Sequence, residues 1–163
     1  MYKYVSSLSN TIIKHTILLQ EKSKYRKEEQ LFVIDGWKET KMAIENNFEI
    51  ETIFFSEQVD IDDLISELSE NRKATLNQNK LLKVAENVFE KISYRGNTSK
   101  VVSIAQAKSS TYNILDDIEN PLFLVIDGVE KPGNLGAILR IADLQIFMLY
   151  FVPICTQIFL IQM

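Results

Sequence analysis

The sequence has 163 residues, of which 46% are hydrophobic and 25% charged, so it can bury a core and is not a disordered or low-complexity chain. Its one cysteine, Cys155, and one histidine, His15, exclude a disulfide framework and a zinc cluster of Cys and His ligands, and we expect no metal. The net charge of −4 argues against wholesale electrostatic capture of nucleic acid. The charge is uneven, because the charged side chains of residues 14–27 are mostly basic, whereas residues 49–70 carry acids and no base.

Hydrophobic periodicity predicts alternating helices and strands over the first two thirds of the chain. In the helix expected at 37–47, Trp37 should pack in the core, and Met42, Ala43 and Ile44 should point inward. Such alternation is typical of a compact α/β domain. The expected helices cover residues 10–20, 37–47, 61–71 and 81–89, and the expected strands cover residues 31–34, 50–56, 74–78 and 101–107.

Composition divides the chain into four parts. Residues 1–107 form the α/β domain, and residues 108–120 form a polar linker. Residues 121–143 open a second domain with a continuous apolar strand of the kind that parallel sheets bury. Residues 144–163 form an apolar tail without a charged side chain.

A glycine-bearing loop and a helix are expected after the strand of the second domain. Gly133 and Gly136 permit a tight turn and close approach of another backbone. The first turn of such a helix has free N–H groups for an anion or a polar substrate group. Asn134 and Arg140 are candidates for a site at the carboxyl end of the strand, where α/β folds bind ligands, although asparagine is also a routine helix N-cap.

The segment PGNLGAILRIAD resembles the first signature of the SpoU/TrmH class of SPOUT RNA 2′-O-ribose methyltransferases. That signature is a strand followed by D-x-x-x-x-P-x-N-x-G-x-x-x-R-x-A, and every position is met. The run KSKYRKEEQLFVIDGWKE resembles the opening of that family's small RNA-binding domain, with Asp35 where Glu is more usual. The residues that match the signature are Asp127, Pro132, Asn134, Gly136, Arg140 and Ala142.

This resemblance implies an α/β fold in two parts, a small ribosomal-protein-like RNA-binding domain followed by the first part of an α/β knot methyltransferase domain. It implies ribosomal or transfer RNA as substrate, S-adenosylmethionine as methyl donor and a homodimer in the intact family. It also implies that Arg140 helps to activate the ribose 2′-hydroxyl and that Asn134 supports the site. A cation beside this poor nucleophile lowers the cost of its deprotonation.

Basic side chains of the first domain are candidates for contact with RNA phosphates, each adding salt-dependent affinity. The alternative interpretation is an ordinary solvated helix edge. The sequence does not identify the RNA or the nucleotide modified. The RNA-binding candidates are Lys14, Lys22, Lys24, Arg26, Lys27 and Arg95.

The resemblance ends at Asp143, and the family's further signatures, which build the knot and hold the cofactor, do not follow. We therefore expect no cofactor site in this chain and no activity for it alone. Our main hypothesis is a reading-frame shift near Asp143, because the back-translated codons 155–163, read in another frame, allow the family's next signature, T-D-[LI]-[FY]-N-P-N.

Two other interpretations of the chain stay open. One is an RNA-binding module with an incomplete catalytic stub. The other is a C-terminal membrane anchor, since about 20 apolar residues span a bilayer, although Pro153 weakens it and a membrane partner is not our expectation. The N-terminus has no long apolar run of the secretory type, so we expect a cytoplasmic protein.

Overall fold

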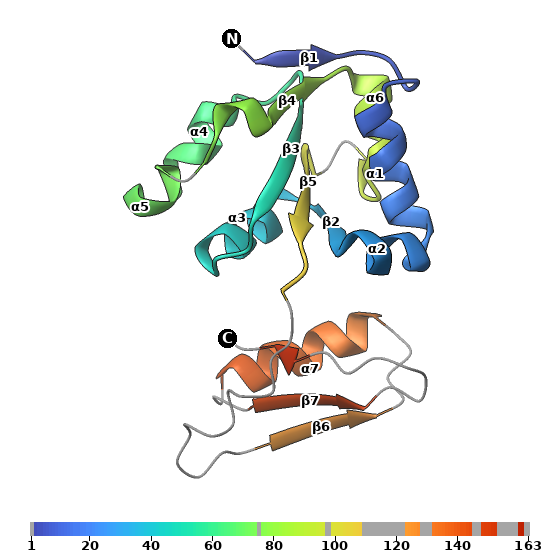
Figure 1. Cartoon of the computed structure of the whole chain (residues 1–163). Helices are drawn as coiled ribbons and strands as arrows, with labels where there is room; N and C mark the ends of the chain where they lie inside the picture. The colour runs from blue at the N-terminus through green and yellow to red at the C-terminus, as the bar shows by residue number, and fades with distance from the viewer. Residues whose placement is uncertain are drawn as a thin grey trace. The chain divides into compact units, whose positions relative to one another are not determined.

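The chain folds into two compact units, Met1–Lys108 and Ser109–Met163 (Figure 1). The structure, a computed structural model, describes the first unit almost completely and the second in four segments. The described residues are 2–74, 76–96, 99–108, 123–127, 132–144, 148–152 and 160–161.

The first unit is built around a five-stranded mixed sheet with the order β1-β4-β3-β5-β2. β1 and β3 both run parallel to β4, and β5 is antiparallel to both of its neighbours. The strands are β1 (Lys3–Val5), β2 (Leu31–Asp35), β3 (Ile50–Ser56), β4 (Leu81–Val84) and β5 (Val101–Gln106).

Helices cover both faces of this sheet (Figure 1). α1, α2 and α6 contribute side chains to the hydrophobic cluster on one face, and α3 and α4 contribute to the cluster on the other. The helices are α1 (Thr11–Glu21), α2 (Ser23–Glu29), α3 (Trp37–Glu45), α4 (Ile61–Ser66), α5 (Glu70–Lys73) and α6 (Glu86–Ile92), with a 3₁₀ turn at Gln78–Lys80.

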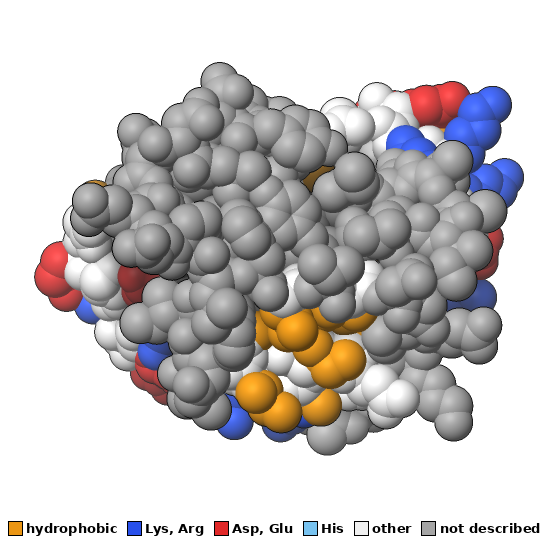
Figure 2. Space-filling model, turned by 90° about the horizontal axis from the view of Figure 1, so that it is seen from below, with side chains coloured by type: hydrophobic (Ala, Val, Ile, Leu, Met, Phe, Trp, Pro, Cys, Tyr) orange, Lys and Arg blue, Asp and Glu red, His pale blue; other side chains and the backbone are white. Residues whose placement is uncertain are grey.

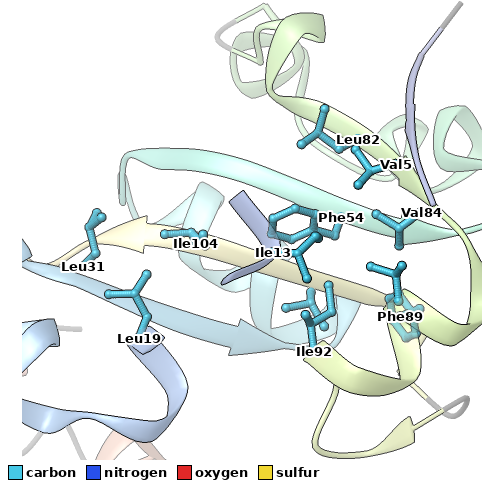
Figure 3. Close-up of a cluster of buried hydrophobic side chains, with 12 residues drawn as sticks. Val5, Ile13, Leu19, Leu31, Phe54, Leu82, Val84, Phe89, Ile92 and Ile104 are labelled. Carbon is cyan, nitrogen blue, oxygen red and sulfur yellow. The ribbon is translucent and has the colours of Figure 1, made fainter. Parts of the chain in front are cut away.

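The central strands are apolar on both sides because both faces of the sheet are covered. In β3, Phe54 joins the cluster beneath α1 and α6, while Ile53 and Phe55 join the opposite one. Figure 3 shows the first of these clusters, in which Ile13 of α1 and Phe89 of α6 lie on the same side of the sheet as Phe54. Each such side chain contributes about 1.5–3 kcal/mol on burial, so this packing fixes the helices on the sheet.

The helix predicted at 81–89 is wrong in its first half and confirmed at residues 86–89. Residues Leu81–Val84 are strand β4, and α6 begins only at Glu86. The physical reason is burial on both sides, because Leu81 belongs to one hydrophobic cluster and Leu82 to the other. A short apolar run of this kind has no periodicity that separates a strand from a buried helix.

Three further predictions for this unit are corrected. Residues 76–80 contain no strand, and the helix expected at 61–71 is divided into α4 and α5. Met42 is 67% exposed, whereas Ala43 and Ile44 are buried. Successive helical residues point about 100° apart, so three consecutive side chains do not share one inward face. Trp37 is buried, as predicted.

The described residues of the second unit form a three-stranded sheet of order β6-β7-β8 and one helix. β6 (Phe123–Asp127) and α7 (Pro132–Leu144) confirm the predicted strand and helix. Ile126 and Ala142 form the buried centre of this unit, with Leu124, Leu135, Ile138 and Leu139 packed against them. One face of α7 is thereby fixed toward β6.

Part of the predicted apolar tail forms strands. β7 (Met148–Val152) pairs in parallel with β6 along its whole length, and β8 (Leu160–Ile161) pairs antiparallel with β7. Cys155 and the predicted linker beyond Lys108 lie outside the described residues. Among the helices described, none has the length and apolar character that a membrane crossing requires.

Candidate functional site

α7 carries both residues predicted to be catalytic. It begins at Pro132, a residue suited to the first helical position because its missing N–H would have no partner there. Asn134 and Arg140 are both exposed. Their separation of six residues corresponds to about 600° of helical rotation, so the two side chains leave the helix about 120° apart. The structure therefore does not bring Asn134 and Arg140 onto one helix face.

Arg140 extends back along α7 toward the preceding turn. Its Nη1 lies 3.8 Å from the position that a Cβ atom on Gly136 would occupy. This is an ordinary van der Waals distance, so an alanine at position 136 would also leave room for the guanidinium. A tight turn was expected at Gly133 and Gly136, but both lie inside α7 and neither has a positive φ, so this expectation is wrong. The side chain of Asp127 lies outside the described part of the chain.

The basic segment of the first unit contains side chains with two different roles. Lys14, Lys22 and Lys27 are exposed, and they form no ion pair with the described residues. Lys24 lies 3.7 Å from Glu28 in a highly exposed ion pair, which contributes little to stability and leaves the ammonium accessible. These four lysines can meet an anionic partner without breaking the fold.

Arg26 instead stabilises the end of α1. Its Nη1 donates hydrogen bonds to the main-chain oxygens of Leu19, at 2.6 Å, and Gln20, at 2.9 Å. These carbonyls belong to the last turn of the helix, where no further helical N–H is available. Arg26 was predicted to contact RNA, and the structure adds this structural role.

The acid–glycine pair at the end of β2 organises the segment that follows α6. Asp35 Oδ2 accepts hydrogen bonds from the main-chain nitrogens of Tyr94, at 2.7 Å, and Arg95, at 3.0 Å, and from Ser93 Oγ at 3.2 Å. Gly36 has φ +123°, and a Cβ there would overlap Glu39 Oε2. Glu39 in turn accepts a hydrogen bond from Arg95 Nη1 at 2.9 Å.

The α1–α2 corner and the segment after α6 meet at Gln20. Its main-chain oxygen accepts a hydrogen bond from Tyr94 Oη at 3.3 Å as well as the one from Arg26, and its side chain donates to the main-chain oxygen of Ile92. The structure thus brings Tyr94, which the sequence did not single out, beside the basic segment, while the side chain of its neighbour Arg95 pairs with Glu39 of α3. We call the following set the basic surface: Lys22, Lys24, Arg26, Lys27, Tyr94 and Arg95.

Acidic residues between 45 and 70 are held in structural hydrogen bonds. Trp37 Nε1 and Lys41 Nζ, each 3.2 Å from Glu67 Oε2, lower the pKa of that carboxyl group. Hydrogen bonds from Ser69 lower the pKa of Glu45. In the part of the chain that the structure describes, no group of three or more His, Cys, Asp or Glu residues could hold a metal ion.

His15 is a residue of α1 in the first unit. It is half-buried, its ring packs edge-on against Tyr25 with centroids 5.7 Å apart, and it lines a surface hollow of about 630 Å³ between β1 and α1. Exposed hydrophobic side chains are few among the described residues; Ile141 of α7 is 61% exposed. Figure 2, a view from below, shows described hydrophobic side chains at the surface, with acidic and basic side chains toward the sides.

Comparison with protein families gives a match over most of the first unit. The family described as the MRM3-like substrate binding domain matches residues 10–103. The chain belongs to this family.

Relatives of the MRM3-like chain extend the match to both units. This chain is 55% identical over 47 residues to the 23S rRNA (guanosine-2′-O-)-methyltransferase RlmB of Ralstonia nicotianae. The match covers 26% of this chain and 19% of that protein. The AdoMet-bound rRNA methyltransferase of Sinorhizobium meliloti is 28% identical with a TM-score of 0.74, covering 96% of this chain and 56% of the other. The AdoMet complex of the SpoU methyltransferase AviRb from Streptomyces viridochromogenes, 19% identical with a TM-score of 0.65 over 87% of this chain and 52% of the other, shares the fold.

These matches confirm the resemblance to SpoU-class 2′-O-methyltransferases and the predicted α/β fold class. The matched segment spans 19% of the curated relative, and the chain spans 56% of the Sinorhizobium structure. In the second unit the buried described residues, Ile126 and Ala142, are apolar, and the exposed polar ones include Asn134 and Arg140. We assign the cofactor to none of these described residues.

Proposed function

We propose that this chain is the substrate-binding domain and the first catalytic-domain segment of an S-adenosylmethionine-dependent RNA 2′-O-ribose methyltransferase. The observation that carries the proposal is the combination in one chain of the MRM3-like substrate-binding domain and the complete signature on β6 and α7. Ribosomal RNA is the proposed substrate, since the Ralstonia relative and the Sinorhizobium structure are both named as rRNA methyltransferases.

The two units take different parts in this proposal. The first unit, residues 1–107, binds RNA through the basic surface and Lys14, because exposed ammonium groups gain affinity by releasing counterions from phosphates. After the linker 108–120, residues 121–143 present Arg140 to the ribose. Its guanidinium stabilises the oxyanion that develops when the 2′-hydroxyl loses its proton, and Asn134 supports the site through hydrogen bonds. The intact enzyme is proposed to be a cytoplasmic homodimer.

We also propose that the 163-residue chain by itself binds RNA without transferring a methyl group. This is the second candidate function, an RNA-binding module with an incomplete catalytic segment. The observation that favours it is the exposure of Lys14, Lys22, Lys24 and Lys27 in the first unit, which leaves four ammonium groups accessible to RNA phosphates.

Two measurements on the full chain test these proposals. A gel-shift titration with 23S rRNA fragments is expected to show binding that weakens as salt increases. Isothermal titration calorimetry with S-adenosylmethionine is expected to show no heat of binding. Detectable cofactor binding, or transfer of a labelled methyl group to the RNA, would overturn the second proposal and support an active enzyme. Failure to bind any RNA would overturn both.

A further inference from the structure

Tyr94 is held in place at two points while its ring stays open to solvent. Its main-chain nitrogen donates to Asp35 and its hydroxyl donates to the main-chain oxygen of Gln20, yet 70% of the residue is exposed. An apolar ring in this position gains nothing from burial in the fold. Because both ends of the residue are tethered, little conformational freedom remains to be lost when a ligand packs against the ring.

The cations of the basic surface lie beside this ring. Arg26 and Tyr94 donate to the same oxygen atom, so the guanidinium and the phenol hydroxyl are immediate neighbours. Lys22 lies two residues beyond Gln20, where α1 ends and α2 begins, and the Arg95 guanidinium is held by Glu39 of α3. An exposed aromatic ring bordered by cations suits a ligand that has both a flat π-face and a phosphate. An unpaired nucleotide has both.

The other exposed aromatic side chain among the described hydrophobic residues gives a direct contrast. Tyr4 is 51% exposed, but its hydroxyl donates to Glu57 at 2.7 Å, in a part of the chain that carries acids. Its register partner on β4 is Lys83, so this site differs from that of Tyr94 in holding an acid at the hydroxyl. Tyr4 therefore provides a matched control in residue type, exposure and hydrogen-bonded hydroxyl.

We propose that Tyr94 is a base-stacking residue that binds an unpaired nucleotide of the RNA while the lysines of the basic surface hold the flanking phosphates. This rests on the proposed RNA-binding function and adds to it a preference for single-stranded RNA. Stacking requires a base that is free of its neighbours, which a continuous duplex does not offer. Because every base has a π-face, the contact selects unpaired RNA without selecting a sequence.

The test compares two fluorescein-labelled RNAs, a hairpin with a single-stranded loop and a fully paired duplex of the same length. Fluorescence anisotropy of the full chain and its Y94A, Y94F and Y4A variants gives the affinities. Stacking on an aromatic side chain is worth about 1–3 kcal/mol, so Y94A should bind the hairpin about five-fold to 150-fold more weakly. Binding of the duplex should change by less than about two-fold. Y4A should bind like the unmodified chain, and Y94F, which keeps the ring but loses the hydrogen bond to Gln20, should bind the hairpin more tightly than Y94A.

A second readout separates stacking from a general effect on the fold. A 2-aminopurine base placed in the hairpin loop should be quenched by the unmodified chain and by Y94F, and should stay bright with Y94A. The slope of log affinity against log salt should be the same in Y94A as in the unmodified chain, because the lysines that meet the phosphates are unchanged.

Three outcomes would overturn the assignment of Tyr94. These are unchanged hairpin affinity in Y94A, an equal loss for hairpin and duplex, and quenching that persists in Y94A. If lysine variants of the basic surface weaken binding while Y94A does not, the RNA-binding function stands and the stacking proposal falls. If the unmodified chain binds neither RNA, both fall.

Discussion

The hydroxyl groups of Thr40 and Ser103 share a hydrogen bond of 2.8 Å, and both side chains are fully buried. The bond links α3 to the central strand β5, inside a layer that is otherwise apolar. Replacing one partner leaves the other hydroxyl buried without a partner, which costs about 1–3 kcal/mol. S103A should therefore lower the free energy of unfolding by that amount. The double variant T40V/S103A should recover part of the loss, as measured by urea denaturation.

M42A serves as the control for these hydroxyl variants, because Met42 lies on the same helix as Thr40 and is 67% exposed. Its free energy of unfolding should stay within about 0.5 kcal/mol of the unmodified chain. Strictly additive losses in T40V and S103A would contradict a direct bond between the two hydroxyl groups.

Gly36 and Gly133 should respond in opposite directions to the same substitution. G36A places a Cβ against Glu39 Oε2 at a φ of +123°, and should cost about 1–3 kcal/mol. G133A adds a methyl group with no atom within 4 Å inside α7, and should stabilise by up to about 1 kcal/mol. Thermal unfolding followed by circular dichroism gives both shifts. A shift of the same sign in the two variants would be inconsistent with this backbone geometry.

Asp35 should control the order of the segment that carries Tyr94 and Arg95. D35A removes the carboxylate that accepts both of their main-chain hydrogen bonds. The amide protons of these two residues should then be less protected from exchange with solvent. RNA affinity should fall in the same variant. D63A removes an exposed acid of α4 and should leave both unchanged. Unaltered exchange in D35A would show that other contacts hold the segment.

The lysines of the basic surface should determine the salt dependence of RNA binding. Removing one ammonium group that meets a phosphate should reduce the slope of log affinity against log salt by about 0.7–0.9. K22A and K27A should each show this reduction in anisotropy titrations over a range of salt. K38A removes an exposed lysine of α3, which packs on the opposite face of the sheet from α1 and α2, and should not. An equal effect of all three would indicate binding by net charge alone.

Tyr2 should make the first unit sensitive to alkaline pH. Burial, and then the hydrogen bond from its hydroxyl to Asp62 at 2.5 Å, raise the pKa of Tyr2 from its ordinary 10.0 to about 12. A raised pKa means that the stabilising contribution is complete below the unfolded value of 10.0 and is lost as pH rises toward 12. The free energy of unfolding of Y2F should therefore depend less on pH between 10.0 and about 12 than that of the unmodified chain. Parallel curves for Y2F and the unmodified chain would refute this contribution.

The sequence predicts those elements whose pattern depends on local burial alone. β3 and β5 are mostly apolar runs, and α1 buries Ile13, Thr16 and Leu19 at intervals of three residues, so their positions follow from the residues. β4 is short and its two leucines face opposite clusters, and this is visible only once the sheet has formed. β1 escapes prediction for the same reason, since its three residues are a strand only beside β4.

The residues of the candidate site also differ in whether the sequence alone predicts them. The signature places Asn134 and Arg140 on one helix, and their catalytic roles stay predictions. Tyr94 has no local pattern, because its position depends on a hydrogen bond to Gln20 across most of the first unit. The hypothesis that residues 144–163 are out of frame also stays a prediction. Sequencing the gene from the codon for Asp143 onward tests it, and an unaltered reading frame would refute it.

The order of strands in the first sheet determines when this unit can fold during synthesis. β5, the last of its strands to be translated, lies between β3 and β2, and it is the strand that joins β2 to the other three. A nascent chain that has not yet released Val101–Gln106 from the ribosomal exit tunnel therefore holds an isolated β2 and a β1-β4-β3 sheet with an open edge. Until β5 emerges, this edge is available to chaperones or to other nascent chains.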